Sequence, residues 1–342
     1  MSKGDLRWKQ KLLAFTMSSI LVLVLLGAGE LFCRVFLDIN LRKTSREFVT
    51  ISDRGFVTGN EPNAKGVSFG VPVFSDENGF RVPAGFSYQP ADEAILLVGD
   101  SVTFGVGVPE EATFAGRLRT ALPETRVYNS GVIGFAIPDY VRTVEKALSE
   151  KGDIQKVYLF YCLNDFQMPD VYTKPTPSDS SLWKSVKRAV GNGFIWVNEF
   201  FGPRSKLYVF LTGMTIDPSR QYYLSDIRNM DVDDARFEEV MRPLVEIGRG
   251  LEQRGIGYTI VLSPYEVQLR RSFSDGFEPQ ERVRRYLNAN GIRTLDTRER
   301  FQRLADPSMA FLFADPMHLS PAGHELVYET LLEDLNRPDK TE

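Results

Sequence analysis

The chain has 342 residues, of which 43% are apolar and 25% charged, a composition typical of a folded globular protein. A formal net charge of -4 provides no broad cationic field, which argues against nucleic acid binding by phosphate neutralisation. The two cysteines do not define a disulfide framework, and the two histidines are too few for a histidine-rich zinc site, so we expect neither a metal ion nor another cofactor.

The amino-terminal region has the pattern of a membrane segment. Residues 12–29 contain no charged side chain, and the apolar character resumes after Glu30. This stretch is long enough for about one bilayer crossing, and it exceeds the apolar core of about 7 to 15 residues found in cleaved signal peptides. We predict a cytoplasmic tail over residues 1–11 and a single-pass anchor over residues 12–37.

The side of the membrane follows from the basic residues that flank this segment. Four of them lie within residues 3–11 and four within residues 34–46, but the first set is denser and closer to the span. The positive-inside rule therefore places the amino end in the cytoplasm and the folded domain outside the cytoplasmic membrane. Small residues at Gly27 and Gly29 leave signal cleavage as an alternative, whereas the bulky residues before Cys33 argue against its lipidation.

Residues 38–90 are rich in Gly, Pro, Asn and Ser and contain only short alternating pieces. We interpret them as a linker with minor strands, outside the core. Residues 66–70 match the Gly-x-Ser-x-Gly pattern of α/β-hydrolases, but that pattern requires a strand before the serine and a helix after it. Neither is indicated here, so Ser68 is not expected to be a nucleophile.

Residues 91–338 alternate between the two apolar periodicities. The predicted strands are residues 94–98, 127–128, 157–162, 258–262 and 292–295, and the predicted helices are residues 112–122, 137–148, 237–251 and 321–335. Such alternation predicts an α/β domain with a parallel sheet that is flanked by helices on both faces.

One insertion, at about residues 166–234, interrupts this alternation. It contains prolines, a serine-rich patch and several aromatic residues. Aromatics in an insertion more often form a small core of their own, and the functional alternative is a lid or a wall that faces the substrate.

The candidate chemistry begins where the first strand of the domain ends, at Gly99-Asp100-Ser101. Ligands of open α/β sheets bind beyond the carboxyl ends of strands. A serine hydroxyl needs a base, most often an imidazole that is oriented by a carboxylate. Asp315 lies three residues before His318 on a short loop, so its carboxylate can accept the ring N–H and leave the other nitrogen for Ser101. The alternative is a loop histidine bonded to a carboxylate for stability alone.

Acyl transfer also needs donors directed at the developing oxyanion. Two loops that follow predicted strands offer them: residues 129–134, where Gly131 permits close approach of backbone N–H groups, and residues 162–165, where Asn164 carries a side-chain amide. Either loop alone is more often a simple turn.

Together these blocks resemble the SGNH (GDSL-like) hydrolase family, because all four occur here in the family's order. Ser101 matches the nucleophile block, Gly131 the second, Asn164 the third, and Asp315 with His318 the last. The resemblance covers roughly residues 90–336 and implies a flavodoxin-like sheet. It also implies an oxyanion hole made of the Ser101 and Gly131 N–H groups and the Asn164 amide.

Two further segments extend the resemblance. Residues 318–324 look like the family's transition from the catalytic loop into the last helix, which implies that His324 packs or caps. Residues 78–81 (Asn-Gly-Phe-Arg) look like a feature of membrane-anchored members, many of them encoded near envelope polysaccharide genes. Cys162 departs from the glycine that many members have in the third block.

We therefore expect a serine esterase that acts on acyl esters, with an envelope glycan or a lipid as the candidate substrate. The first alternative is an O-acyltransferase, in which a sugar hydroxyl instead of water accepts the acyl group from the same acyl-enzyme. The second is a non-catalytic envelope assembly protein on the same scaffold, against which the presence of the complete triad argues.

Overall fold

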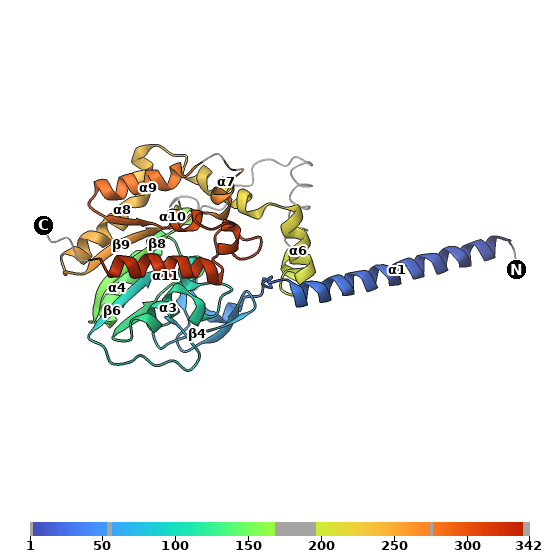
Figure 1. Ribbon diagram of the computed structural model, residues 1–342, viewed down its shortest axis with the longest axis horizontal. Coiled ribbons are helices and arrows are strands. Elements are labelled where there is room, and N and C mark those ends of the chain that lie inside the picture. Colours follow the sequence, from blue (N-terminus) through green and yellow to red (C-terminus); the bar gives the residue numbers. More distant parts are fainter. Residues whose placement is uncertain (1–2, 53–56, 168–195, 272, 274–275, 338–342) are drawn as a thin grey trace.

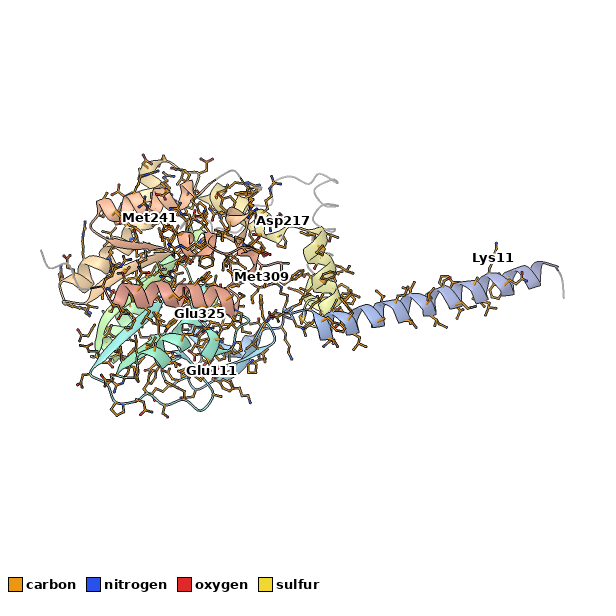
Figure 2. The ribbon with its side chains drawn as sticks, in the orientation of Figure 1. Lys11, Glu111, Asp217, Met241, Met309 and Glu325 are labelled. Carbon is orange, nitrogen blue, oxygen red and sulfur yellow. The ribbon has the colours of Figure 1, made fainter. Side chains whose placement is uncertain are left out.

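The computed structural model describes residues 3–52, 57–167, 196–271, 273 and 276–337. Helix α1 (Lys3–Phe36) projects from one end of the α/β body (Figure 1). Its stretch Gln10–Phe36 is long and apolar enough to cross a membrane, and the most apolar part of that stretch is not buried. Side chains along the projecting part, such as Lys11, stand clear of the body (Figure 2). A helix with the length and composition of a single-pass anchor is thus present where the sequence predicts it.

An eight-stranded sheet forms the centre of the body. In spatial order its strands are β10 (Arg293–Asp296), β9 (Gly257–Leu262), β8 (Ile154–Tyr161), β6 (Glu93–Val98), β7 (Thr125–Asn129), β5 (Arg81–Val82), β4 (Val71–Ser75) and β3 (Lys65–Ser68). The five strands β6 to β10 are parallel. Counted along the chain, these five have the spatial order 2-1-3-4-5, which is the flavodoxin-like order and confirms the predicted fold class.

Helices cover the sheet, and α3 packs against α11 while α4 packs against α8. Figure 1 shows α3 and α11 side by side in front of the strands. The helices of the body are α2 (Ser101–Phe104), α3 (Phe114–Ala121), α4 (Ile137–Glu150), α6 (Lys206–Thr215), α7 (Pro218–Asn229), α8 (Asp234–Glu252), α9 (Glu278–Ala289), α10 (Arg298–Gln302) and α11 (Pro321–Leu335), and residues 196–201 are also helical. Short 3-10 helices are η1 (Arg46–Phe48), η2 (Glu110–Ala112), η3 (Leu163–Asp165), η5 (Glu266–Leu269) and η6 (Pro307–Ala310).

The central parallel strands β6 and β8 are buried on both faces, as is typical of a parallel sheet between two helix layers. Residues 94–98 of β6 are all buried, and so are residues 157–161 of β8. Their continuous apolar runs explain why these strands were visible in the sequence. The last helix begins as predicted, because the Ser320 hydroxyl accepts the Gly323 N–H at 3.3 Å.

The interpretation of residues 38–90 as a segment outside the core is wrong. Strands β3, β4 and β5 extend the main sheet in antiparallel fashion from β7, and Phe80 lies in the main core. Phe48 and Val73 form a second apolar cluster with Phe104 and Val106, which follow Ser101 in the chain. These strands cover what would otherwise be an exposed edge of β7, which short alternating pieces do not reveal in a sequence. Strands β1 (Val49–Ile51) and β2 (Val57–Asn60) form a separate two-stranded sheet.

The predicted insertion falls partly outside the described residues, because residues 168–195 are not described. Its described part packs on the rest of the molecule. Helix α6 contacts α1, α7 contacts η3 and η5, and Tyr223 of α7 lies in the main core.

Candidate active site

Ser101 lies at the turn between the central strand β6 and the short helix α2. Asp100 caps this helix, because its Oδ1 accepts the Val102 N–H at 2.9 Å. As the first residue of the helix, Ser101 has a backbone N–H that needs no acceptor within the helix. The side chain sits at the carboxyl ends of the parallel strands, where the fold places ligands.

The structure brings Ser101, His318 and Asp315 together from distant parts of the chain. His318 Nε2 lies 2.9 Å from Ser101 Oγ, and His318 Nδ1 lies 2.9 Å from Asp315 Oδ2. Asp315 Oδ1 accepts the backbone N–H groups of Met317 at 3.1 Å and His318 at 2.8 Å, so the loop curls around its own carboxylate. Because that carboxylate accepts the Nδ1 proton, Nε2 is left as an acceptor for the serine hydroxyl.

The surroundings lower the pKa of Asp315 and raise the pKa of His318. Burial by itself raises the pKa of Asp315, but the charge and hydrogen bonds of His318, together with Arg42, hold it well below its usual range. Burial by itself lowers the pKa of His318, but Asp315 and, less strongly, Asp100 raise it above its ordinary value, against an opposing contribution from Arg42. The carboxylate is therefore ionised, and the imidazole is held as a strengthened base.

Arg42, which follows the anchor, is a part of the site that the sequence did not indicate. Its Nη1 donates to Asp315 Oδ2 at 2.7 Å, and its Nη2 donates to the carbonyls of Phe313 at 3.3 Å and Ala314 at 3.1 Å. The guanidinium lies over the Phe69 ring, 4.8 Å from its centre, and that ring meets the His318 ring edge-on at 5.6 Å. The segment expected to be a linker thus packs directly against the catalytic loop.

In the two loops expected to form the oxyanion hole, some of the candidate donors already make hydrogen bonds within the protein. Asn164 donates one amide hydrogen to Asp100 Oδ2 at 3.0 Å, which leaves the other. The single N–H of Gly131 donates to Asn129 Oδ1 at 3.0 Å, and Gly131 packs closely against Phe104. Further along the same loop, Gly134 is exposed at φ 86°, and its N–H donates no hydrogen bond among the described residues.

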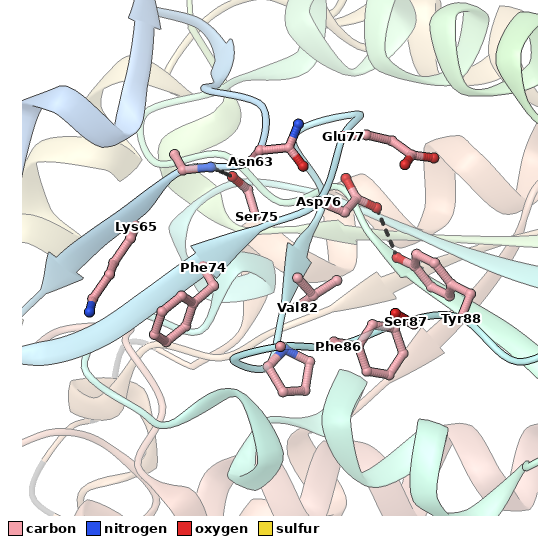
Figure 3. Close-up of a pocket in the computed structure, with 13 residues that line it drawn as sticks. Asn63, Lys65, Phe74, Ser75, Asp76, Glu77, Val82, Phe86, Ser87 and Tyr88 are labelled. Carbon is pink, nitrogen blue, oxygen red and sulfur yellow. Dashed lines mark hydrogen bonds between the residues drawn. The ribbon is translucent and has the colours of Figure 1, made fainter.

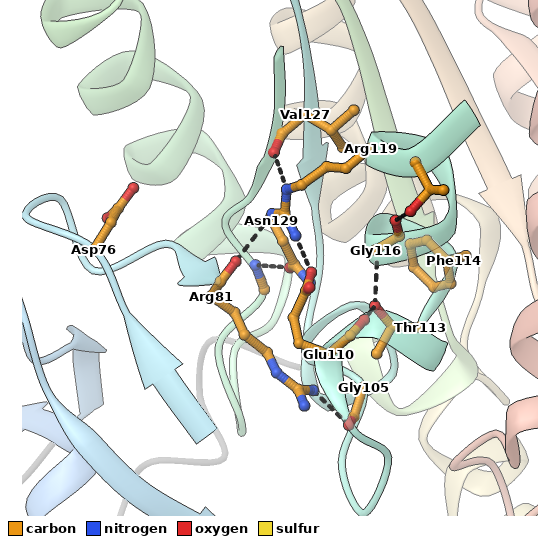
Figure 4. A network of polar contacts seen from close by, with 12 residues as sticks. Asp76, Arg81, Gly105, Glu110, Thr113, Phe114, Gly116, Arg119, Val127 and Asn129 are labelled. Atoms are coloured by element: carbon orange, nitrogen blue, oxygen red, sulfur yellow. Dashed lines mark hydrogen bonds and ion pairs between the residues drawn. The ribbon is translucent and has the colours of Figure 1, made fainter. Parts of the chain in front are cut away.

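A buried arginine holds the end of helix α2 and the chain that follows it. Arg81 donates to the carbonyls of Phe104, Gly105 and Val108 (Figure 4 shows the Gly105 contact), and burial with the nearby charge of Arg119 lowers its pKa to about 9. Arg119 in turn pairs with Glu110 and donates to the Arg81 carbonyl at 3.0 Å. Arg81 of the Asn-Gly-Phe-Arg segment thus holds the end of α2, the helix that begins with Ser101, and the chain that follows it.

His324 has the packing role implied for it. Its Nδ1 accepts the Phe114 N–H at 3.3 Å, and its ring packs on the Phe114 ring. Burial and the neighbouring charge of Arg81 lower its pKa to about 3, so it stays neutral.

A cavity of about 660 Å³ opens beside Asp315 and His318, and Ser101 is not among its lining residues. Its walls include His318 and Asp315, Arg42 and Phe69 from the segment after the anchor, and four residues of the insertion: Val209, Thr212, Gly213 and Ile216. The described part of the insertion therefore forms a wall next to the catalytic loop.

A second cavity, of about 500 Å³, lies between β4 and the segment that follows β5, with Phe74, Phe86 and Tyr88 in its walls (Figure 3). One of its two carboxylates, Asp76, already accepts the Phe80 N–H at 2.8 Å and the Tyr88 hydroxyl at 3.1 Å. None of the triad residues lines this cavity.

No protein-family model matches the sequence, and no curated protein matches it. Among solved structures, the chain is similar to a lipolytic protein of the G-D-S-L family from Veillonella parvula DSM 2008, at 14% identity and a TM-score of 0.43 over 72% of this chain and 100% of that one. A putative lipolytic protein of the same family from Desulfitobacterium hafniense DCB-2 has 15% identity and a TM-score of 0.40 over 70% and 98%. A mutant acetyl-xylooligosaccharide esterase from Geobacillus has 15% identity and a TM-score of 0.43 over 74% and 98%. The first two are described as G-D-S-L family proteins, the group that the four sequence blocks resemble.

Proposed function

We propose that the chain is a serine hydrolase of acyl esters, with Ser101 as nucleophile, His318 as general base and Asp315 as the carboxylate that orients it. The observation that supports this most strongly is the continuous line from Ser101 Oγ through the imidazole to Asp315, with 2.9 Å at each step. Such an arrangement converts a weak hydroxyl nucleophile into an effective one.

The reaction proceeds in two halves. Ser101 Oγ attacks the ester carbonyl carbon while His318 Nε2 takes the hydroxyl proton, and the resulting imidazolium is stabilised by Asp315. The tetrahedral intermediate then expels the alcohol, which receives that proton, and leaves an acyl group on Ser101. A water molecule, deprotonated by the same imidazole, attacks the acyl-enzyme and releases the acid.

Negative charge on the carbonyl oxygen needs donors that are already oriented. The Ser101 N–H at the start of α2 and the uncommitted amide hydrogen of Asn164 are two. The loop after β7 supplies the third, from Gly131 if its N–H leaves Asn129, or otherwise from the exposed Gly134 N–H.

The anchor helix suggests where these esters are found. The denser basic flank at residues 3–11 favours an amino end in the cytoplasm, so we propose that the catalytic domain lies on the outer side of the cytoplasmic membrane. Esters of envelope polysaccharides or of lipids are the substrates within reach of that position.

The direct test is turnover of p-nitrophenyl acetate by the full chain in detergent micelles. We expect release of p-nitrophenol that is insensitive to a chelator, since the proposed chemistry uses side chains alone. Absence of turnover, or its loss on chelation, would contradict the proposed mechanism.

The role of Asn164 gives a second prediction. Asn164→Ala should lower kcat by on the order of a hundredfold, the usual effect of losing one oxyanion donor. Gln253→Ala, which removes an exposed amide just after α8, is the control and should keep its activity. A normal rate for Asn164→Ala, with an unchanged melting temperature, would show that Asn164 is not an oxyanion donor and that the third block has a structural role.

The pH dependence gives a third prediction. The base must be neutral to act, so kcat/KM should fall as the pH drops through the pKa of His318, which lies above the ordinary value of about 6.5. Because Arg42 lowers that pKa, Arg42→Met should move the acid limb to higher pH, while Arg42→Lys should restore it. An acid limb that is identical in all three proteins would show that Arg42 has no electrostatic influence on the base.

A further inference from the structure

Helix α6 joins the membrane anchor to the wall of the catalytic cavity. Its sequence after Lys206 contains no charged residue, which is unusual for a helix on the surface of a protein body. Figure 1 shows α6 standing across the carboxyl end of α1, between the anchor and the body.

Hydrogen bonds fix the start of α6 to the anchor. The Glu30 carboxylate accepts the backbone N–H groups of Lys206 at 3.2 Å and Leu207 at 2.9 Å, and it also accepts the Ser205 hydroxyl at 2.8 Å. Gly29 leaves room for the Leu207 side chain, since a Cβ at Gly29 would lie 3.2 Å from it. The two helices are therefore held at a defined level along the anchor.

That level corresponds to the bilayer surface. At about 1.5 Å per residue, the uncharged residues 12–29 span about 27 Å, close to the hydrocarbon thickness of about 30 Å. Glu30 then falls at the headgroups, where its ion pair with Arg34, at 2.6 Å, is accessible to water. Since the first residues of α6 are bonded to Glu30 and α6 crosses the anchor, an anchor that spans a bilayer over residues 12–29 would hold α6 at the level of the headgroups.

The outer side of α6 and the helical residues 196–201 expose an apolar patch. Its members, each between 41% and 68% exposed, are Trp196, Phe200, Phe201, Leu211 and Met214. Arg204 lies over the Phe200 ring at 4.6 Å and stays exposed. Aromatic and basic side chains beside an apolar helix face are typical of elements that lie in the membrane interface.

The inner side of the same helix touches the catalytic site. Val209, Thr212 and Ile216 line the cavity beside His318, on the side opposite to Leu211 and Met214. Gly213 lies directly against Phe313 and Ala314, the residues before Asp315. A single helix thus separates the apolar patch from the cavity.

We propose that α6 lies in the headgroup layer with the apolar patch inserted among the lipids, and that the ester cleaved at Ser101 belongs to an amphiphile whose apolar chain remains in the bilayer. The second half of this inference rests on the proposed esterase function, while the first half does not. Because the patch adjoins the anchor, we infer that lipid covers it and not a second protein.

The position of the patch is tested by fluorescence, independently of activity. The full chain with Trp8→Phe and Trp183→Phe, which retains Trp196 as its one tryptophan, is placed in nanodiscs of phosphatidylcholine brominated near the headgroup end of its acyl chains. We expect strong quenching by the brominated lipid and weak quenching by aqueous acrylamide. Quenching by acrylamide alone places Trp196 in water, and quenching by neither places it against protein; both results overturn the inference.

The substrate class is tested with p-nitrophenyl palmitate in nanodiscs and p-nitrophenyl acetate in solution. Leu211→Glu combined with Met214→Glu should lower palmitate turnover at least tenfold and leave acetate turnover unchanged. Met309→Glu, at an equally exposed methionine outside the patch (67% against 68% for Met214), should affect neither. Equal effects on both esters would overturn the inference that the substrate is held in the bilayer. A wild-type chain that is inactive on both esters would contradict the esterase proposal, while the quenching result would still test the position of the patch.

Discussion

Ser101→Ala is expected to reduce ester turnover to near background, a loss on the order of a millionfold in kcat, as removal of a triad nucleophile does elsewhere. The reason is that Ser101 Oγ supplies the bond to the acyl group, and no other hydroxyl contacts His318 Nε2 among the described residues. The measurement is the single-turnover release of p-nitrophenol by the full chain in micelles.

Ser68→Ala is the matched control for this variant. Ser68 carries the misleading Gly-x-Ser-x-Gly pattern and is buried in β3, and its hydroxyl has no hydrogen-bond partner among the residues that the structure describes. Its activity should match that of the wild type. The reverse result, with Ser101→Ala active and Ser68→Ala inactive, would transfer the nucleophile to the other serine.

Asp315→Asn is expected to lower kcat by about ten-thousandfold while the fold is retained, since an amide of the same shape can hold the imidazole in the wrong tautomer. The amide also removes the negative charge that raises the pKa of His318, so the acid limb of the remaining activity should shift to lower pH. Both effects appear in one pH profile of kcat/KM.

Asp306→Asn, at an exposed carboxylate that precedes the same loop, is the control for the loss of one negative charge. It should leave both the rate and the acid limb unchanged. If Asp315→Asn lost only a few-fold in rate, the bond between Asp315 and His318 would be structural and the base would act without it.

The sequence was most informative where residues are buried or carry short motifs. The parallel strands were predictable because continuous apolar runs such as residues 94–98 are typical of strands buried on both faces. Ser101, Asp315 and His318 were predictable as a set because each lies at a strand end or on a short loop, and because the order of the blocks restricts how they can meet. The distances between them needed the structure.

The prediction that failed was the assignment of residues 38–90 to a linker outside the core, and the reason is physical. Short strands such as β5 (Arg81–Val82) carry too few residues for a periodic pattern, and their pairing with β7 is a long-range contact. Arg42 appeared only as one of the charges that flank the anchor, since nothing in the sequence shows that Asp315 lies 2.7 Å from it. The sequence also did not show that the Gly131 N–H donates to Asn129 Oδ1. This bond forms within a local turn, where a side-chain oxygen can capture a nearby backbone N–H.

The central claim is tested most directly by a fluorophosphonate probe, with the modified residue mapped by mass spectrometry on the full chain. The account predicts one adduct, on Ser101, with labelling that is lost in His318→Ala and kept in Ser68→Ala. An adduct on any other residue, or undiminished labelling of Ser101 without the imidazole, would contradict it.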